Sequence, residues 1–138
     1  FLIWAMRDKN AAPLQRVQII KGWVEQTTGR PFEEVIDVAC SDGLTPDPLT
    51  NRCPDNGALV DISDCSISSD RGTNEIKTVW TDESFDSAVK SFYYVRVLEN
   101  PSCRWSTWDA VKNGTKPRED LKQTIQERAW SSPIWYSY

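Results

Sequence analysis

The chain contains no histidine among its 138 residues. Imidazole is the commonest general base near neutral pH and a frequent zinc ligand in proteins. Its absence excludes a Ser-His-Asp or Cys-His catalytic triad and the usual histidine-containing zinc sites. Metal-dependent chemistry would have to rest on carboxylates alone, and we do not expect this chain to be an enzyme by itself.

The chain also has no excess of basic residues, because its formal net charge is −4. Nucleic acids and anionic membranes are bound through clustered Lys and Arg, so neither is a predicted partner. The longest apolar run at the start of the chain, residues 1–6, is too short to cross a bilayer, and no membrane span is predicted. The chain begins inside this run without an initiator Met, and we expect it to be a C-terminal fragment of a longer protein.

Aromatic residues are abundant, with seven Trp, four Tyr and four Phe, while there is one Met. This composition is typical of a β core and argues against a helical bundle. The stretch from Ser91 to Glu99 alternates apolar side chains on both faces, which predicts a central strand that ends before Pro101. Further strands are expected at residues 1–7, buried on both faces, and at 14–25, 32–40, 58–62, 75–80, 124–130 and 133–138.

One short helix is expected after the central strand, capped by Ser106 or Thr107 and ended by Asn113 and Gly114. Many short strands, little helix and no repeat predict a fold that is mainly all-β. We therefore expect residues 1–138 to form a single antiparallel β-sandwich with Ig-like architecture.

The four cysteines, Cys40, Cys53, Cys65 and Cys103, contain no Cys-x-x-Cys pair, so disulfides are favoured over a zinc ribbon. Three pairings are possible. Cys40 and Cys53 flank a loop rich in Pro and Gly that can close on itself, which favours this pair and leaves Cys65 with Cys103. Disulfides imply the periplasm or the outside of the cell. The alternative is four reduced, buried thiols.

The same loop carries Asp42, Asp47 and Asp55, whose oxygen atoms are the ligands that calcium prefers. Their spacing does not match an EF-hand. Acidic residues also form solvated turns, so we assign no metal to this chain and keep the three aspartates only as calcium candidates.

Four segments resemble a known family: RVQIIKGW (16–23), VWTDESFD (79–86), FYYVRVLENPSCRWSTWDA (92–110) and TIQERAWSSPIWY (124–136). They look like the C-terminal part of the bacterial family catalogued as domain of unknown function 3604. The resemblance implies a secreted or periplasmic protein. Its larger N-terminal part, absent here, is similar to metal-dependent phosphoesterases of the polymerase-and-histidinol-phosphatase type, so a divalent metal is expected there and no cofactor in this chain. The family often has Trp at the position of Cys40. The resemblance therefore implies that the disulfides belong to a subgroup of the family.

The resemblance implies an accessory domain that packs on the N-terminal catalytic domain and lends residues to the rim of its site. The rim candidates are Arg96, Arg104, Glu127, Arg128 and Trp130, because the planar fork of arginine suits phosphate or carboxylate. Each could instead be structural, and Trp130 and Trp135 are also candidates for an interdomain contact. The alternative function is a glycan-binding module that stacks sugars on exposed tryptophans. No oligomeric state is predicted.

Overall fold

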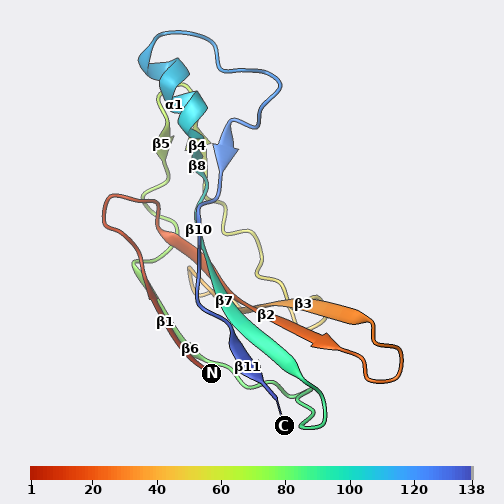
Figure 1. Cartoon of the computed structure of the whole chain (residues 1–138). Helices are drawn as coiled ribbons and strands as arrows, with labels where there is room; N and C mark the ends of the chain where they lie inside the picture. The colour runs from red at the N-terminus through yellow and green to blue at the C-terminus, as the bar shows by residue number, and fades with distance from the viewer. Residues whose placement is uncertain (138) are drawn as a thin grey trace.

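Two antiparallel β-sheets stack in the lower half of the molecule (Figure 1), seen in a computed structural model that describes residues 1–137. The larger sheet has the strand order β10-β7-β2-β3, and β11 also pairs with β7. The smaller sheet is the pair β1-β6. The strands of the two sheets are β1 (Leu2–Met6), β2 (Leu14–Val24), β3 (Pro31–Cys40), β6 (Glu75–Val79), β7 (Ser91–Glu99), β10 (Arg128–Trp130) and β11 (Ile134–Tyr136).

The core lies between the two sheets, because each sheet turns one apolar face inward. Ile3 and Ile76 come from the smaller sheet, and Val17, Ile19 and Tyr93 come from the larger one. Val17 and Ile19 are almost completely inaccessible to solvent, at 0% and 1% exposure. The prediction of a mainly β, antiparallel sandwich with one short helix is confirmed.

The prediction that residues 1–7 are buried on both faces is wrong. Ile3 is buried, but Leu2, Trp4 and Met6 expose 83%, 61% and 69% of their surface. The reason is that β1 belongs to a two-stranded ribbon, which has only the larger sheet to pack against and leaves its other face in solvent.

A narrower end carries the only helix of the described residues, α1 (Trp105–Lys112), beyond two small ribbons (Figure 1). These ribbons pair β4 (Val60–Asp61) with β5 (Ser66–Ile67), and β8 (Ser102–Cys103) with β9 (Thr124–Ile125). The expected cap at Ser106 or Thr107 is wrong. Arg104 occupies the N-cap position without a side-chain bond, and the buried Thr107 hydroxyl donates to the Gln123 carbonyl at 2.8 Å.

The single strand expected at 124–130 is divided into β9 and β10. It divides because these strands have different partners, β8 in the upper ribbon and β7 in the larger sheet. The strand expected at 58–62 shortens to β4. The last expected strand, 133–138, is β11, and its final residue, Tyr138, lies outside the described residues. The helix ends as expected, with Gly114 at a φ of 62°.

Two disulfide bonds cross-link the chain, Cys40–Cys53 and Cys65–Cys103. The two cysteines of each bond are 13 and 38 residues apart in sequence, respectively. They are the two pairs that the sequence favoured. Disulfides persist where the surroundings are oxidising, so they indicate an oxidising compartment. Within residues 1–137, no helix has the length and apolar character needed to cross a membrane.

Candidate functional site

A row of aromatic side chains lies on the face of the larger sheet that points away from the core. We call Phe92, Tyr94, Trp130 and Trp135 the aromatic face. The strand register places Trp135 opposite Phe92 and Trp130 opposite Arg96, so their side chains share one side of the sheet. The rings of Phe92 and Tyr94 are stacked with centroids 6.3 Å apart, and Phe92 contacts Trp135 at 5.1 Å.

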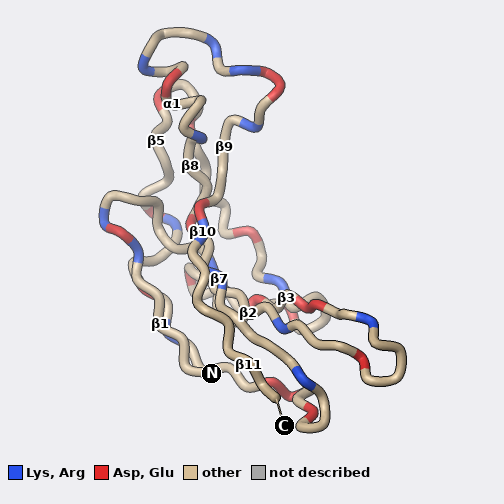
Figure 2. The backbone as a smooth tube through the Cα atoms, in the orientation of Figure 1, with Lys and Arg blue, Asp and Glu red and all other residues tan. Residues whose placement is uncertain are grey.

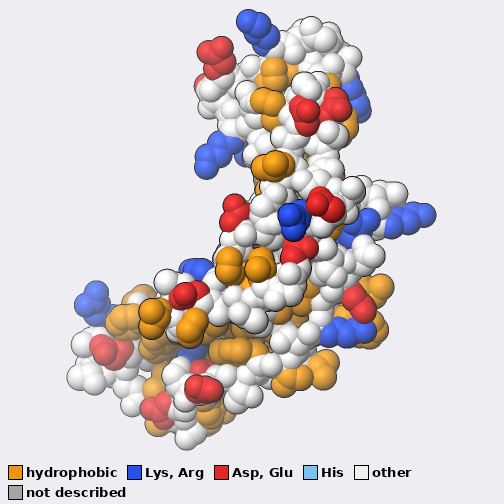
Figure 3. Space-filling model, turned by 180° about the vertical axis from the view of Figure 1, so that it is seen from behind, with side chains coloured by type: hydrophobic (Ala, Val, Ile, Leu, Met, Phe, Trp, Pro, Cys, Tyr) orange, Lys and Arg blue, Asp and Glu red, His pale blue; other side chains and the backbone are white. Residues whose placement is uncertain are grey.

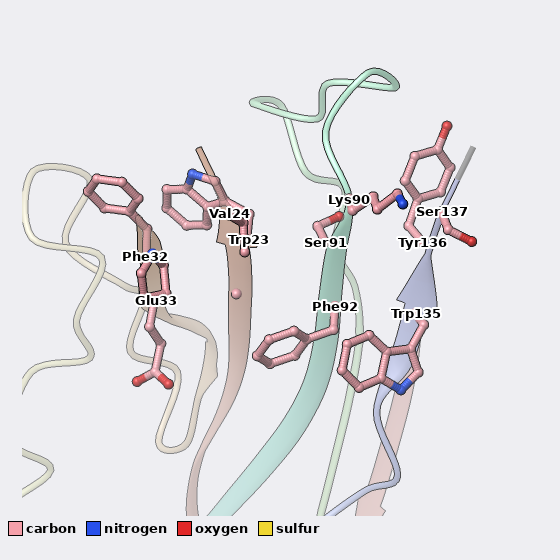
Figure 4. A pocket seen from close by; sticks show the side chains of 12 residues that line it. Trp23, Val24, Phe32, Glu33, Lys90, Ser91, Phe92, Trp135, Tyr136 and Ser137 are labelled. Carbon is pink, nitrogen blue, oxygen red and sulfur yellow. The ribbon is translucent and has the colours of Figure 1, made fainter. Parts of the chain in front are cut away.

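At one end of this face lies a cleft of about 670 Å³, which we call the aromatic cleft. The rings of Phe92 and Trp135 form one wall of the cleft (Figure 4). Trp23 and Phe32 also line it and stack with centroids 5.6 Å apart. Their rings lie on the other side of the sheet, because the register pairs Gly22 with Phe92 and Trp23 with Ser91. Gly22 provides the floor beside Phe92. The polar side chains at its margin, labelled in Figure 4, are Glu33, Lys90, Ser91 and Ser137.

A second groove, of about 570 Å³, lies where β9 leads into β10. We call it the basic groove. It brings together four of the predicted rim residues, Arg104, Glu127, Arg128 and Trp130, and adds Lys122, which sequence reasoning did not single out. Figure 2 shows charged residues of both signs beside the β10 label. The remaining lining residues are Pro101, Thr124, Ile125 and Gln126.

Arg104 is the most constrained charged residue of the basic groove. It follows Cys103, which is bonded to Cys65, and its backbone N–H donates to the Gln123 carbonyl at 2.9 Å. The Nε atom of its guanidinium is buried and has no hydrogen-bond partner. A buried N–H group without an acceptor is unusual in proteins, so this atom calls for an explanation.

Gln126 lines the basic groove, and two hydrogen bonds hold its side chain in place. Its side-chain amide donates to Gln15 Oε1 at 2.8 Å and to the Glu99 carbonyl at 3.0 Å. Glu99 itself is half-buried beside the groove. Burial raises the pKa of the Glu99 carboxyl, and the negative charges of Glu127 and Asp8 raise it further.

Arg96 and Trp135 do not join this groove. Trp135 belongs to the aromatic cleft, whereas the Nε atom of Arg96 donates to Gln18 Oε1 at 2.7 Å. Gln18 in turn donates to Asp37 Oδ1 at 2.5 Å, and Asp37 is only 3% exposed. Asp37 also pairs with Arg16 at 3.6 Å. Arg96 is therefore held in a structural network.

Residues 1–138 match a family model described as Protein of unknown function (DUF3604). The chain belongs to the DUF3604 family. Comparison with the curated proteins and with the solved structures gives no match. In this DUF3604 chain, Arg104, Glu127, Arg128, Trp130 and Trp135 all lie in the segments 92–110 and 124–136 that carry the family resemblance, whereas Lys122 lies between those segments.

A second polar cluster of the DUF3604 chain lies near the C-terminal end of β2. Lys21 Nζ lies 2.6 Å from Asp82 Oδ2, and the Tyr93 hydroxyl donates to the same oxygen at 2.7 Å. Burial alone would raise the pKa of Asp82, but hydrogen bonds from Lys21, Tyr93 and Ser84, with the charge of Lys21, bring it below its ordinary value. These bonds fasten the loop before β7 to β2. Sequence reasoning missed the cluster, although a lysine inside an apolar strand was a visible signal.

The calcium candidates of the DUF3604 chain lie in separate turns. Asp47 accepts backbone N–H bonds from Leu49 and Thr50 at 2.9 and 2.8 Å, and Asp55 accepts one from Gly57 at 3.0 Å. Asp42 accepts hydrogen bonds from elsewhere in the fold, including one from the Gly72 N–H. In the part of the chain that the structure describes, no three His, Cys, Asp or Glu side chains gather as they would around a metal ion.

Proposed function

We propose that this chain is the non-catalytic accessory domain of a secreted or periplasmic bacterial metal-dependent hydrolase. It packs through the aromatic face on the catalytic domain of the same protein and places the basic groove at the rim of that domain's site. The catalytic domain holds the divalent metal and carries out the reaction, which is phosphoesterase-like. The family resemblance supports the identity of the partner, and the surface described below supports the contact.

The exposure of the aromatic face is the observation that carries this proposal. Trp130 and Trp135 expose 58% and 71% of their surface on the same edge of the larger sheet. Arg128 and Glu127 lie next to Trp130, so an apolar patch is bordered by charged groups. Viewed from behind, hydrophobic side chains also surface in several places over the sheet-bearing half (Figure 3). Large exposed aromatic patches with polar rims are typical of protein interfaces.

The contact can be tested by mixing the 138-residue chain with a separately produced catalytic domain and measuring association by calorimetry. Trp135→Ala should weaken association at least tenfold, because buried tryptophans dominate interface energies. The matched control is Trp105→Ala, since Trp105 exposes 73% of its surface on α1, at the opposite end of the molecule. Equal effects of the two substitutions, or no effect of either, would contradict this assignment of the contact.

Glycan binding is the second candidate, and the aromatic cleft is the observation that favours it. Trp135 exposes 71% of its surface beside Phe92 on one wall of the cleft, with Glu33 at the margin to accept sugar hydroxyls. A screen of soluble oligosaccharides by tryptophan fluorescence tests this function. Saturable binding that Trp135→Ala abolishes and Trp105→Ala preserves would support it, whereas no binding by any oligosaccharide would remove it.

A further inference from the structure

We propose that the basic groove binds the oxyanion head of a small organic anion, a carboxylate or a phosphate, with Arg104 as its principal contact. The inference deepens the rim role proposed above. It rests on that function only for the source of the anion, since binding of a free anion is a property of the groove's own residues.

Arg104 carries an unsatisfied hydrogen-bond donor. Arg104 Nε is buried without a partner, and no described residue forms an ion pair or a side-chain hydrogen bond with this guanidinium. A guanidinium presents parallel N–H groups that match the two oxygens of a carboxylate or phosphate. An oxyanion in the groove would supply the acceptor that Nε lacks.

The groove also has an excess of positive charge. Arg104, Lys122 and Arg128 line the groove with one carboxylate, Glu127, and among the described residues none of these three cations has an ion-pair partner. Four arginines elsewhere do have such partners: Arg16 and Arg52 pair with Asp37, Arg71 with Asp70 and Arg118 with Asp120. The concentration of unpaired positive charge at one groove favours an anionic ligand.

Covalent and hydrogen bonds hold two parts of the groove in place. The Cys65–Cys103 disulfide fixes the strand before Arg104, and Gln126 is anchored by two hydrogen bonds. Such preorganisation lowers the entropy lost on binding. Trp130 adds an apolar wall and Glu127 an acceptor. The expected ligand therefore carries an oxyanion, a flat or apolar body and a hydroxyl group.

The test is a titration of the ¹⁵N-labelled 138-residue chain with inorganic phosphate and, separately, with acetate, while the Nε–H signals of the arginines are followed by NMR. We expect the Arg104 signal to shift and saturate with at least one anion. The matched control is Arg118, whose Nε donates to Asp120 at 3.0 Å on the surface and which should show no saturable shift.

Substitutions complete the test. Arg104→Lys keeps the charge but removes the planar fork, and affinity for the anion should fall about tenfold or more. Arg118→Lys should leave affinity within about twofold, and Lys122→Gln should weaken it less than Arg104→Lys. Thermal unfolding of each variant verifies that it is folded. If Arg104→Lys fails to fold, the wild-type Nε–H titration alone decides.

A shift of Arg104 that grows linearly with both anions and never saturates would overturn the proposal, as would unchanged affinity in a folded Arg104→Lys variant. Repeating the titration with the catalytic domain bound identifies the source of the anion. Competition between phosphate and that domain indicates that a carboxylate of the domain occupies the groove, and simultaneous binding indicates a free ligand. If only the anion test fails, the proposed contact between the aromatic face and the catalytic domain is unaffected, because Trp135 lies outside the groove.

Discussion

The ring of Phe92 on β7 lies over Gly22 on β2, at the place where a Cβ atom on residue 22 would stand. Trp135 and Tyr94 contact the same ring from other sides. Because glycine has no side chain, residue 22 leaves room for the Phe92 ring, which forms one wall of the aromatic cleft. This explains why a glycine, which weakens a strand by itself, occupies the interior of a long β2.

Gly22→Ala should destabilise the protein by about 1–3 kcal/mol, because the added methyl group forces Phe92 out of its position among the neighbouring rings. Urea unfolding measures the change. In a Phe92→Ala background the same substitution should be neutral or stabilising, because the overlap is gone and alanine costs less backbone entropy than glycine. Equal effects in both backgrounds would show that the ring is not the cause.

Breaking the ion pair between Lys21 and Asp82 should be costly. Their side chains are only 9% and 7% exposed, so Asp82→Asn leaves a buried ammonium without its counter-charge. We expect a loss of about 3 kcal/mol or more in the free energy of unfolding. The matched control is Glu75→Gln, which removes the exposed partner of Lys77 and should cost about 1 kcal/mol or less. Similar losses in the two variants would contradict the buried geometry.

The same aspartate predicts an acid-dependent stability. The folded-state pKa of Asp82 lies below its ordinary value of 3.8, so its stabilising contribution is complete above that value and is lost as the pH falls through the lower folded-state pKa. The urea midpoint of the wild type should therefore fall below pH 4. Asp82→Asn should show a shallower fall, and parallel curves for the two proteins would rule out this contribution.

Much of the fold could be predicted because alternation of apolar and polar residues along the sequence is typical of a strand with one buried face. The long strands β2, β3 and β7 lie close to their expected positions, and the loop after Cys40 closes through the favoured disulfide. The error at β1 has a physical cause. An apolar sequence does not reveal whether one face or both faces of the strand will be covered by other elements. The two-stranded ribbon that contains β1 packs on one side only.

The candidate site could be predicted only in part, because a site depends on which strand ends meet. Arg104 and Arg128 were predicted as rim candidates because the planar fork of arginine suits an oxyanion. The break between β9 and β10 that places both at one groove follows from strand pairing. Lys122 had no distinguishing pattern. Asp37 lies in the strand expected at 32–40 and was given no role, yet segment 51–53 covers it, and the Cys53 N–H donates to it at 2.8 Å.

Glu99→Gln should stabilise the protein at neutral pH. Burial raises the folded-state pKa of Glu99 above its ordinary value of 4.5, as do the charges of Glu127 and Asp8, so its charged form is less favourable in the folded state. A raised carboxyl pKa stabilises the fold at low pH, and that contribution disappears as the pH rises through the folded-state value. The variant should therefore gain stability relative to wild type between pH 4 and pH 7. Glu127→Gln should produce a smaller gain, and a loss in both variants would contradict the assignment.

Removing the Cys65–Cys103 disulfide should affect both stability and the basic groove. The bond joins residues 38 apart, so its loss in Cys65→Ala with Cys103→Ala should cost about 3–4 kcal/mol through the entropy of the unfolded chain. The control pair, Cys40→Ala with Cys53→Ala, spans 13 residues and should cost about 3 kcal/mol or slightly less. Urea unfolding without reductant measures both losses.

The two double variants should differ more clearly in anion binding than in stability. Cys103 immediately precedes Arg104, and β8 is otherwise held to β9 by a two-residue ladder, so the guanidinium loses its fixed position when the bond is absent. Phosphate affinity should fall several-fold without Cys65–Cys103 and stay unchanged without Cys40–Cys53, because the latter bond ties β3 to its loop, away from the groove. If both variants are folded and bind phosphate equally well, the disulfide contributes stability alone and the ladder with Gln126 suffices to position Arg104.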